Sequence, residues 1–400
     1  MKTGDVLVGI SGDGDIAARG ENGGVVTSLL KLALQDGMVD GVLTVSRGGS
    51  RFEGVPTYVT DPQKLTACAG SLHFASPSLA RSLRKHLETH ANRVAVVCRS
   101  CDARAVIELA KINQLNIENV LMIGINCSGT LSPVPHIEML RGLDLDPYRL
   151  EWEDIDGSTL VMRFEDGQER RFDLTELEQQ GLGRRANCLR CEHPVPRMAD
   201  LACGKWGLEE DDRGRTIVEI CSQKGKALLE RAVESGIVEV SPAGAKQIER
   251  RRSRENEKVE SALRRQSEDF RPPEDKFFWF SQFESCIKCY GCRDACPMCH
   301  CKRCVLERDV PETVTRGVIP PPPTFGMIRF LHVACHCVNC GQCEDVCSAD
   351  IPLSRLGHYL SKSANRLFGY EAGLDITAPL PLGAIPEEEK RLEGAEMAGG

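Results

Sequence analysis

The sequence predicts an α/β domain followed by a smaller, mostly helical domain that is rich in cysteine. Two observations lead to this fold class. Between residues 5 and 150, apolar segments of strand length alternate with segments of helical periodicity, which is typical of β–α–β units around a mostly parallel sheet. Residues 277–360 then hold 12 of the 20 cysteines at short, regular spacings. The two parts are therefore expected to have different architectures.

The first part reads as regular alternation along the chain. Apolar residues at helical spacing predict helices over 24–36, 78–90 and 102–114, and the first of them stops at Gly37. Short apolar runs predict buried strands over 39–45, 94–97 and 120–125. A hairpin is expected over 160–172, with Asp166 and Gly167 at its turn. A further strand–helix–strand unit is expected over 216–221, 224–234 and 237–240.

Residues 246–271 are dense in charges of both signs and end at Pro272 and Pro273. The simplest interpretation is a solvated helix that links two domains. A contact with nucleic acid or a partner protein is the alternative, but acidic residues are interleaved throughout. We therefore divide the chain into an α/β domain (1–245), a charged helical linker (246–275), a cysteine-rich domain (276–365) and a C-terminal tail (366–400).

Composition excludes several classes of function. The net charge of −8 and the pI near 5.7 argue against a general binder of polyanions, which needs clustered Lys and Arg. No segment approaches the roughly 18–20 apolar residues that cross a bilayer, and the N-terminus does not resemble a signal peptide. We expect a cytoplasmic protein, in which thiols stay reduced and clustered cysteines hold metal rather than form disulfides.

Two cysteine motifs in the second part have the spacing of bacterial ferredoxins. The first consists of Cys286, Cys289, Cys292 and Cys296, followed by Pro297, and the second of Cys337, Cys340, Cys343 and Cys347. Three closely spaced thiolates hold three irons of one 4Fe–4S cluster, and the fourth iron is ligated from the other motif. Cys347 would therefore complete the first site and Cys296 the second. Zinc typically uses two separated pairs of ligands instead. We predict a ferredoxin-like domain with two 4Fe–4S clusters.

Four further cysteines lie between or beside these motifs: Cys299, Cys301, Cys304 and Cys335. They form either an additional metal site or a set of packing residues and spare thiols.

Cysteines of the first part follow predicted strands. Cys101 and Cys127 come after neighbouring strands, and Cys188 and Cys191 form a tight pair in a loop. Because ligands bind at the carboxyl ends of strands in an α/β sheet, one interpretation is that these four converge on one cluster. The alternative is unrelated thiols, with Cys98 and Cys101 as a redox dithiol.

The turn at residues 20–24 precedes a helix, where it is either a phosphate-binding turn or an ordinary helix start.

At these residues the chain resembles a known family, the beta subunits of coenzyme F-420-dependent hydrogenases and dehydrogenases, and in particular the formate dehydrogenase branch. The matching segments, in order, are residues 22–33, 70–77, 99–110, 123–129, the Cys188/Cys191 pair with residues 198–200, and residues 368–370 with Asp375. Arg99-Ser100-Cys101 stands where the hydrogenase branch usually has Thr-Pro-Cys, which favours the formate dehydrogenase branch. His73 also departs from the usual pattern.

The resemblance implies that the α/β domain binds FAD. It also implies a third 4Fe–4S cluster on Cys101, Cys127, Cys188 and Cys191. The residues that fall where flavin contacts are expected are Gly23, Gly24, Thr27, Ser71, Ser76 and Lys224.

The function implied is that of an oxidoreductase subunit. Electrons would pass between a separate catalytic alpha subunit, which carries a molybdenum or tungsten pterin, and coenzyme F-420, by way of the clusters and FAD. NAD(P) or a protein is the alternative acceptor. A second hypothesis is an electron relay from formate dehydrogenase or a hydrogenase to a heterodisulfide reductase-like partner, without turnover of coenzyme F-420. A third, an iron–sulfur regulator that binds nucleic acid through residues 246–271, is disfavoured by the acidic pI.

Overall fold

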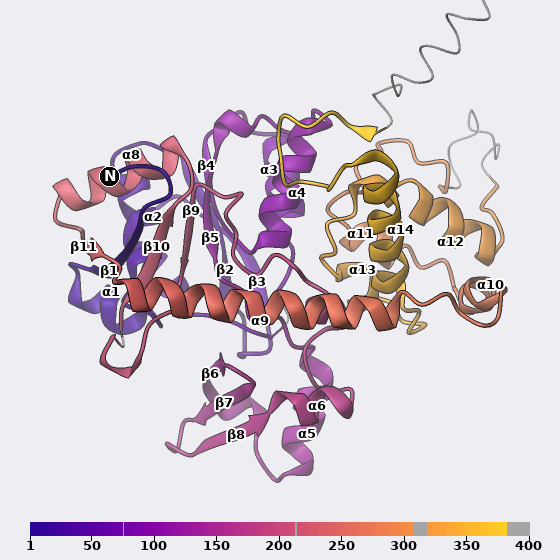
Figure 1. Ribbon diagram of the computed structural model, residues 1–400, viewed down its shortest axis with the longest axis horizontal. Helices are drawn as coiled ribbons and strands as arrows, with labels where there is room; N and C mark the ends of the chain where they lie inside the picture. The colour runs from indigo at the N-terminus through magenta and orange to yellow at the C-terminus, as the bar shows by residue number, and fades with distance from the viewer. Residues whose placement is uncertain (75, 213, 308–317, 382–400) are drawn as a thin grey trace, which may run out of the picture.

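The computed structural model describes residues 1–381 apart from 75, 213 and 308–317. Its main sheet has eight strands in the order β11-β1-β10-β9-β5-β4-β2-β3 (Figure 1). The strands are β1 Val6–Ser11, β2 Gly41–Arg47, β3 Gly54–Val59, β4 Val94–Cys98, β5 Val120–Ile125, β9 Leu201–Gly204, β10 Thr216–Ile220 and β11 Val238–Pro242. The expected alternation of strands and helices is therefore present in this part of the chain.

The prediction of a mostly parallel sheet is wrong. The pairings β2·β4, β4·β5 and β5·β9 are parallel, and the other four pairings in the sheet are antiparallel. The predicted unit of β10, a helix and β11 forms, but β1 lies between its two strands and runs antiparallel to both. Hydrophobic periodicity reports which segments are buried, whereas pairing depends on partners that are distant in sequence.

Helices cover both faces of the sheet. On one face, α2 (Val25–Gln35) and α8 (Gln223–Glu234) share a core with the strands, and on the other lie α3 (Leu79–Leu87) and α4 (Ser100–Lys111). These helices fall within two or three residues of their predicted bounds, because each has a strong apolar stripe. The second face also packs against the cysteine-rich domain, through Met298, Val333 and Val338.

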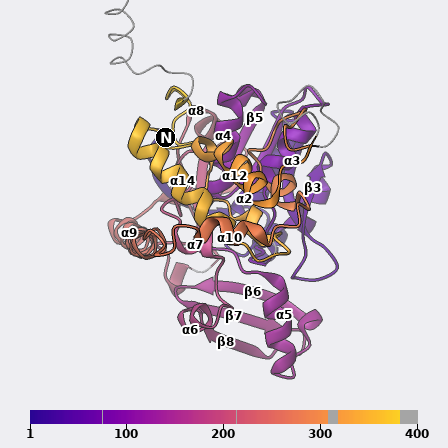
Figure 2. The ribbon, with the colours of Figure 1, turned by 90° about the vertical axis from the view of Figure 1, so that its right-hand side faces the viewer.

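A small three-stranded sheet forms a separate layer, seen at the bottom of Figure 2. It consists of β6 Leu150–Asp156, β7 Thr159–Phe164 and β8 Glu169–Asp173, with α5 Pro133–Gly142 and α6 Leu174–Gln179 beside it. The predicted hairpin is confirmed, since Leu160 pairs with Phe172 and Gly167 has a φ of 79° at the turn. β6 was not predicted, because acidic Glu153 and Asp154 occupy buried positions in it.

The charged segment is a single helix, α9 (Ala245–Asp269), of 25 residues. At 1.5 Å per residue it spans roughly 37 Å, and it crosses the front of the molecule from the main sheet to the cysteine-rich domain (Figure 1). It is not solvated all round. Arg251 pairs with Glu219 of β10 at 2.6 Å, and Asp269 pairs with Arg190 at 2.6 Å. None of the described helices is long and apolar enough to span a bilayer.

The cysteine-rich domain is mostly helical, as predicted. Its helices are α10 Phe278–Glu284, α11 Gly291–Ala295, α12 Pro322–Leu331, α13 Gln342–Asp345 and α14 Leu353–Phe368. The short connecting helices elsewhere are α1 Gly14–Arg19, α7 Ala186–Leu189, η1 Pro62–Cys68, η2 Ile117–Asn119, η3 Pro147–Arg149 and η4 Glu210–Asp212, with η5 Ala334–His336 in this domain. Of the predicted C-terminal tail, residues 370–375 contact α4, and residues 382–400 lie outside the described residues.

Candidate functional site

A large cavity lies at the carboxyl ends of the four parallel strands. Its walls include Val45 at the end of β2, Val97 in β4, Ile125 in β5 and Gly204 at the end of β9. The space between the walls is about 1540 Å³ and opens to solvent. This is the edge at which α/β sheets bind their ligands. The topology therefore creates a site for a large ligand here.

The glycine turn before α2 forms part of this cavity. Gly23 and Gly24 have φ of 72° and 71°, and a Cβ on Gly24 would lie 2.5 Å from the carbonyl oxygen of Ile16. Neither position tolerates a side chain, because the neighbouring backbone of Gly214 and Ile16 is too close, and Gly24 lines the cavity. No side chain caps the N-terminus of α2, and its first turn contains no acidic residue. Free N–H groups at a helix N-terminus favour an anionic group such as phosphate.

The six residues expected to contact a flavin are only partly brought together. Gly24, Thr27, Ser71 and Ser76 line the cavity, and Gly23 lies next to Gly24 in the turn. Lys224 does not line it. Its Nζ lies 3.0 Å from a carboxylate oxygen of Glu118 and donates a hydrogen bond to the carbonyl of Ile117 at 3.2 Å.

Four of the ionisable side chains in the cavity wall, Glu21, His73, Asp154 and Lys205, come from four separate segments. Burial raises the pKa of Glu21. Burial opposes charge on His73, but the nearby carboxylates of Glu153, 3.9 Å from Nδ1, and Glu21 outweigh it and raise the pKa of His73. Burial likewise opposes charge on Asp154, yet contact with Lys205 lowers its pKa overall. Asp154 and Lys205 carry no motif that sequence reasoning would find, because only the fold brings them together.

Four of the eight cysteines in the α/β domain converge on one pocket. Cys101 lies in the first turn of α4, Cys127 follows β5, and Cys188 and Cys191 lie in and after α7. Burial raises the pKa of the Cys101, Cys127 and Cys191 thiols. We call this the N-terminal cysteine site.

The alternative dithiol is disfavoured by the position of Cys98. Its side chain is 1% exposed within the core between β4, α3 and α4, and its thiol donates to the carbonyl of Ile123.

Lys258 of α9 also lines the N-terminal cysteine site, which sequence reasoning missed. Its Nζ donates a hydrogen bond to the carbonyl oxygen of Ser128 at 3.0 Å. Burial and the charge of Arg184 lower the pKa of Lys258 to about 8. In the sequence, Lys258 is one of many charges in a helix that reads as solvated, so no local signal distinguishes it.

The two ferredoxin motifs exchange their last cysteines in the structure. Cys286, Cys289, Cys292 and Cys347 line one pocket, the outer site, where Cys289 is exposed. Cys296, Cys337, Cys340 and Cys343 line another, the inner site. These are the two sets that the spacing predicts.

The two motif loops also have the same backbone shape. Lys288 and Tyr290 in the first motif and Asn339 and Gly341 in the second have positive φ at equivalent positions. These residues curl each loop so that its thiols point inward. The backbone N–H groups of Lys288 and Asn339 thereby reach the sulfurs of Cys286 and Cys337.

The cavity and the three cysteine sites form a continuous series. Arg99, Cys127, Gly129 and Thr130 line both the cavity and the N-terminal cysteine site. The inner site shares Asn339 and Cys340 with the N-terminal cysteine site. It also shares Arg329 and Phe330 with the outer site. Each site therefore shares wall residues with the next one in the series.

Reciprocal amide contacts fix the junction between the two domains in this series. Asn187 Nδ2 donates to the carbonyl of Asn339 at 3.1 Å, and Asn339 Nδ2 donates to the carbonyl of Asn187 at 2.9 Å. Both residues are buried, so these bonds hold the loop that carries Cys188 against the loop that carries Cys340.

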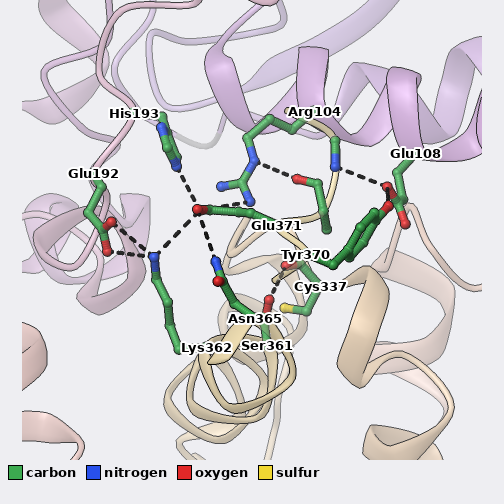
Figure 3. A network of polar contacts seen from close by, with 12 residues as sticks. Arg104, Glu108, Glu192, His193, Cys337, Ser361, Lys362, Asn365, Tyr370 and Glu371 are labelled. Atoms are coloured by element: carbon green, nitrogen blue, oxygen red, sulfur yellow. Dashed lines mark hydrogen bonds and ion pairs between the residues drawn. The ribbon is translucent and has the colours of Figure 1, made fainter. Parts of the chain in front are cut away.

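A polar network around Glu371 holds the domains together beside these sites (Figure 3). The Glu371 carboxylate contacts His193 Nε2 at 2.9 Å, Asn365 Nδ2 at 3.2 Å and, at 3.5 Å each, Arg104 and Lys362. Burial opposes charge on Glu371, but the hydrogen bond from His193 and these cations lower its pKa to about 2. Glu371 therefore joins α4, the loop after Cys191, and α14.

A second carboxylate in Figure 3, that of Glu108, holds the segment after α14 against α4. Glu108 of α4 is buried, and its carboxylate accepts hydrogen bonds from the Tyr370 hydroxyl at 2.5 Å and the Gly373 N–H at 2.9 Å. Burial opposes the charge on Glu108, but the hydrogen bond with His336 outweighs it and lowers the pKa of Glu108.

Comparison with known proteins agrees with this architecture. The family described as coenzyme F-420 hydrogenase/dehydrogenase, beta subunit, matches with its N-terminal part over residues 6–81 and its C-terminal part over residues 91–246. The F-420-dependent formate dehydrogenase subunit beta of Methanocaldococcus jannaschii is 41% identical, over 92% of this chain and 96% of its own length. The F-420-dependent formate dehydrogenase 1 subunit beta of Methanococcus maripaludis is 40% identical, over 93% and 96%.

A solved structure shares the fold of about two thirds of the chain. A chain of the F-420-reducing NiFe hydrogenase complex from Methanosarcina barkeri superposes with a TM-score of 0.58 at 19% identity, over 67% of this chain and 93% of that one. The two curated relatives match nearly the whole chain, including the cysteine-rich domain beyond residue 246. On these matches the chain belongs to the coenzyme F-420 hydrogenase/dehydrogenase beta subunit family.

Proposed function

We propose that this chain is the flavin- and iron–sulfur-carrying beta subunit of an F-420-dependent formate dehydrogenase. In this role it passes electrons between a catalytic subunit and coenzyme F-420 through 4Fe–4S clusters and FAD. The observation that carries the proposal is the continuous series of the cavity and three four-cysteine sites, each sharing residues with the next. Relatives with this name match over more than nine-tenths of the chain.

The cavity fits FAD by the chemistry of its walls. The glycine turn and the uncapped N-terminus of α2 offer backbone N–H groups to a diphosphate. Gly23, Gly24, Thr27, Ser71 and Ser76 are the proposed contacts, and Lys224 is left out because it pairs with Glu118 instead. A flavin bound here would exchange electrons in pairs with a nicotinamide-like coenzyme and singly with the clusters.

Each cysteine site fits one 4Fe–4S cluster, because it gathers four thiols and the two ferredoxin loops have the required curl. Burial raises the pKa of most of these thiols, so binding iron must displace their protons. Neighbouring cations stabilise the resulting negative charge. Lys258 does so at the N-terminal cysteine site and Arg329 at the inner and outer sites.

The carboxyl of Glu21 and the imidazole of His73 supply protons in the cavity. Both have raised pKa values, so each retains a proton at a higher pH than the free side chain. Transfer of a hydride to a deazaflavin also requires a proton, and these two groups lie on the cavity wall. Two ion pairs hold further charges of the wall, Asp154 with Lys205 and Arg99 with Asp102.

Formate chemistry belongs in this proposal to a separate alpha subunit that carries a molybdenum or tungsten pterin. The outer site is the point of contact, since it lies at the far end of the series from the cavity and exposes Cys289. Electrons delivered at the outer site would pass through the inner site and the N-terminal cysteine site to the flavin.

The test is anaerobic purification of the complex, measurement of iron and released flavin, and an assay of coenzyme F-420 reduction with a reduced dye. We expect one FAD per chain, about four irons for each of at least three clusters, and F-420 turnover. Formate-dependent reduction should disappear when the alpha subunit is removed. Absence of flavin would contradict the proposal. Bound FAD without F-420 turnover would favour instead a relay to a heterodisulfide reductase-like partner.

A further inference from the structure

Three of the four additional cysteines gather in one place. Cys299, Cys301 and Cys304 line a single pocket between α3, α11 and α12. Cys335 does not line it and lies instead near Glu108. The four thiols, which the sequence cannot divide, therefore form a group of three and a separate one.

The pocket has room for more than a single metal ion. The space between its walls is about 860 Å³, compared with about 450 Å³ at the outer site and about 440 Å³ at the inner site. Both ferredoxin sites suit a 4Fe–4S cluster in the proposed function. Lack of space therefore does not exclude a cluster of the same kind from this solvent-open pocket.

The walls of this pocket carry an excess of positive charge. Arg81, Arg84, Arg293, Arg329 and Lys302 line it, against the carboxylates of Glu88, Asp294 and Glu307. Arg81 and Arg84 also hold the cysteine loop itself, since their guanidinium groups donate to the carbonyl oxygens of Cys296 and Cys299. A cluster with thiolate ligands is anionic overall, so these cations are suited to surround it.

Arg329 is the strongest of these observations. The residue is 3% exposed, its Nη2 donates to the carbonyl of Cys292, and its Nε and Nη1 make no hydrogen bond within the described residues. A buried cation with two free donors is costly unless anionic groups surround it. Arg329 lines the inner site, the outer site and the pocket of Cys299, Cys301 and Cys304 alike. Anionic sulfur on all three sides would meet this requirement.

We infer that Cys299, Cys301 and Cys304 hold a fourth 4Fe–4S cluster, with a side chain other than cysteine on its fourth iron. This inference rests on the proposed function, in which the other cysteine sites hold clusters. His300 is suited to be the fourth ligand. Its Nδ1 lies 3.0 Å from the carbonyl oxygen of Met298, and a bond there leaves Nε2 free to bind metal, as in many histidine ligands.

The fourth cluster would form a branch of the series. Its pocket shares Met298, Arg329 and Val333 with the inner site, and Cys301 is exposed. One electron would pass from the reduced inner cluster, which is thereby oxidised, to the fourth cluster. The branch would place a second redox group at the surface, beside the outer site, with which its pocket shares Arg329.

The test compares iron and zinc contents of the anaerobically purified complex with those of the triple variant Cys299→Ser, Cys301→Ser, Cys304→Ser. We expect the variant to contain about four fewer irons per complex, the number in one cubane. It should also lose one reducible cluster in a spectroscopic redox titration. Because the irons of the alpha subunit are present in both samples, they cancel in this difference. Cys335→Ser is the matched control and should retain the full iron content.

Equal iron content in the wild type and the triple variant would overturn the inference, as would the loss of one zinc in place of four irons. The single variant Cys301→Ser changes an exposed side chain and provides the same comparison if the triple variant does not assemble. If the proposed function is wrong, the result would look different, because the wild type itself would lack flavin or the irons of the other three sites.

Discussion

Arg329 of α12 donates a hydrogen bond from Nη2 to the carbonyl oxygen of Cys292 over 3.0 Å, and the rest of its guanidinium faces sulfur. Burial opposes its charge, but Cys296, Cys299 and Cys292 surround it and raise its pKa overall. Reduction adds negative charge to a cluster. A fixed, buried cation beside the inner and outer sites would therefore favour the reduced state of the clusters proposed for both.

Replacing Arg329 by Met should lower the reduction potentials of the inner and outer clusters. A unit charge about 7 Å away, at an effective dielectric constant of about 20, corresponds to roughly 100 mV. The measurement is a redox titration followed by electron paramagnetic resonance. Arg329→Lys should restore much of the potential, because it keeps the charge, and exposed Arg264→Gln should change nothing. Potentials that do not move in Arg329→Met would show that the cation has no electrostatic role.

Replacing Gly24 by Ala should greatly reduce the flavin content of the purified protein. The residue has a φ of 71°, and the new Cβ would lie 2.5 Å from the Ile16 carbonyl oxygen, so the turn must shift. The matched control is Gly157→Ala, which has a φ of 65° but open space around its Cβ. The control carries only the cost of the left-handed backbone, about 1 kcal/mol, and should keep its flavin. Equal flavin content in both variants would argue against this turn as part of the flavin site.

Replacing Cys127 by Ser should remove about four irons and interrupt the series at the step next to the flavin cavity. Cys127 lines both the cavity and the N-terminal cysteine site, so electrons from a reduced dye would reach the flavin much more slowly. Stopped-flow measurement of flavin reduction tests this directly. Cys221→Ser is the control, since Cys221 packs beside Val195, Ala202 and Trp206 and lines none of these pockets. An unchanged iron content in Cys127→Ser would place the cluster elsewhere.

Replacing Glu371 by Gln should weaken the attachment of the cysteine-rich domain to α4. The variant removes the carboxylate partner of Arg104, whereas Lys362 keeps Glu192 at 2.9 Å. The loss should cost about 2 kcal/mol and lower the melting temperature by a few degrees. Exposed Glu260→Gln, whose partner Arg264 is 4.0 Å away, should have no measurable effect.

The effect of Glu371 on stability should also depend on pH. Its pKa falls from an ordinary 4.5 to about 2 in the folded protein, so the unfolded chain binds the proton more tightly. The stabilisation is therefore complete above about pH 4.5 and is lost as the pH falls toward 2. Melting curves of the wild type and Glu371→Gln should differ equally at pH 7 and pH 5 and converge at lower pH. A difference that persists unchanged at pH 3 would contradict this origin.

Local chemistry was sufficient for much of the structure. The helix that begins at Val25 and the strand Val120–Ile125 follow from periodicity, because burial of one face is a property of consecutive residues. The hairpin that pairs Leu160 with Phe172 follows from its turn residues. The spacing of the ferredoxin motifs even predicts which distant cysteine joins which loop, since the geometry of a cubane fixes the arrangement of its ligands.

Only the tertiary structure decided the rest. β1 lies antiparallel between β10 and β11. Lys258, in a helix that was predicted to be solvated, lines the N-terminal cysteine site. Lys224 pairs with Glu118 away from the cavity. The tertiary structure also places Cys299, Cys301 and Cys304 in one pocket and Cys335 outside it. Sequence determines what each residue can do and what its near neighbours are, whereas long-range contacts depend on the simultaneous burial of segments that lie far apart in the chain.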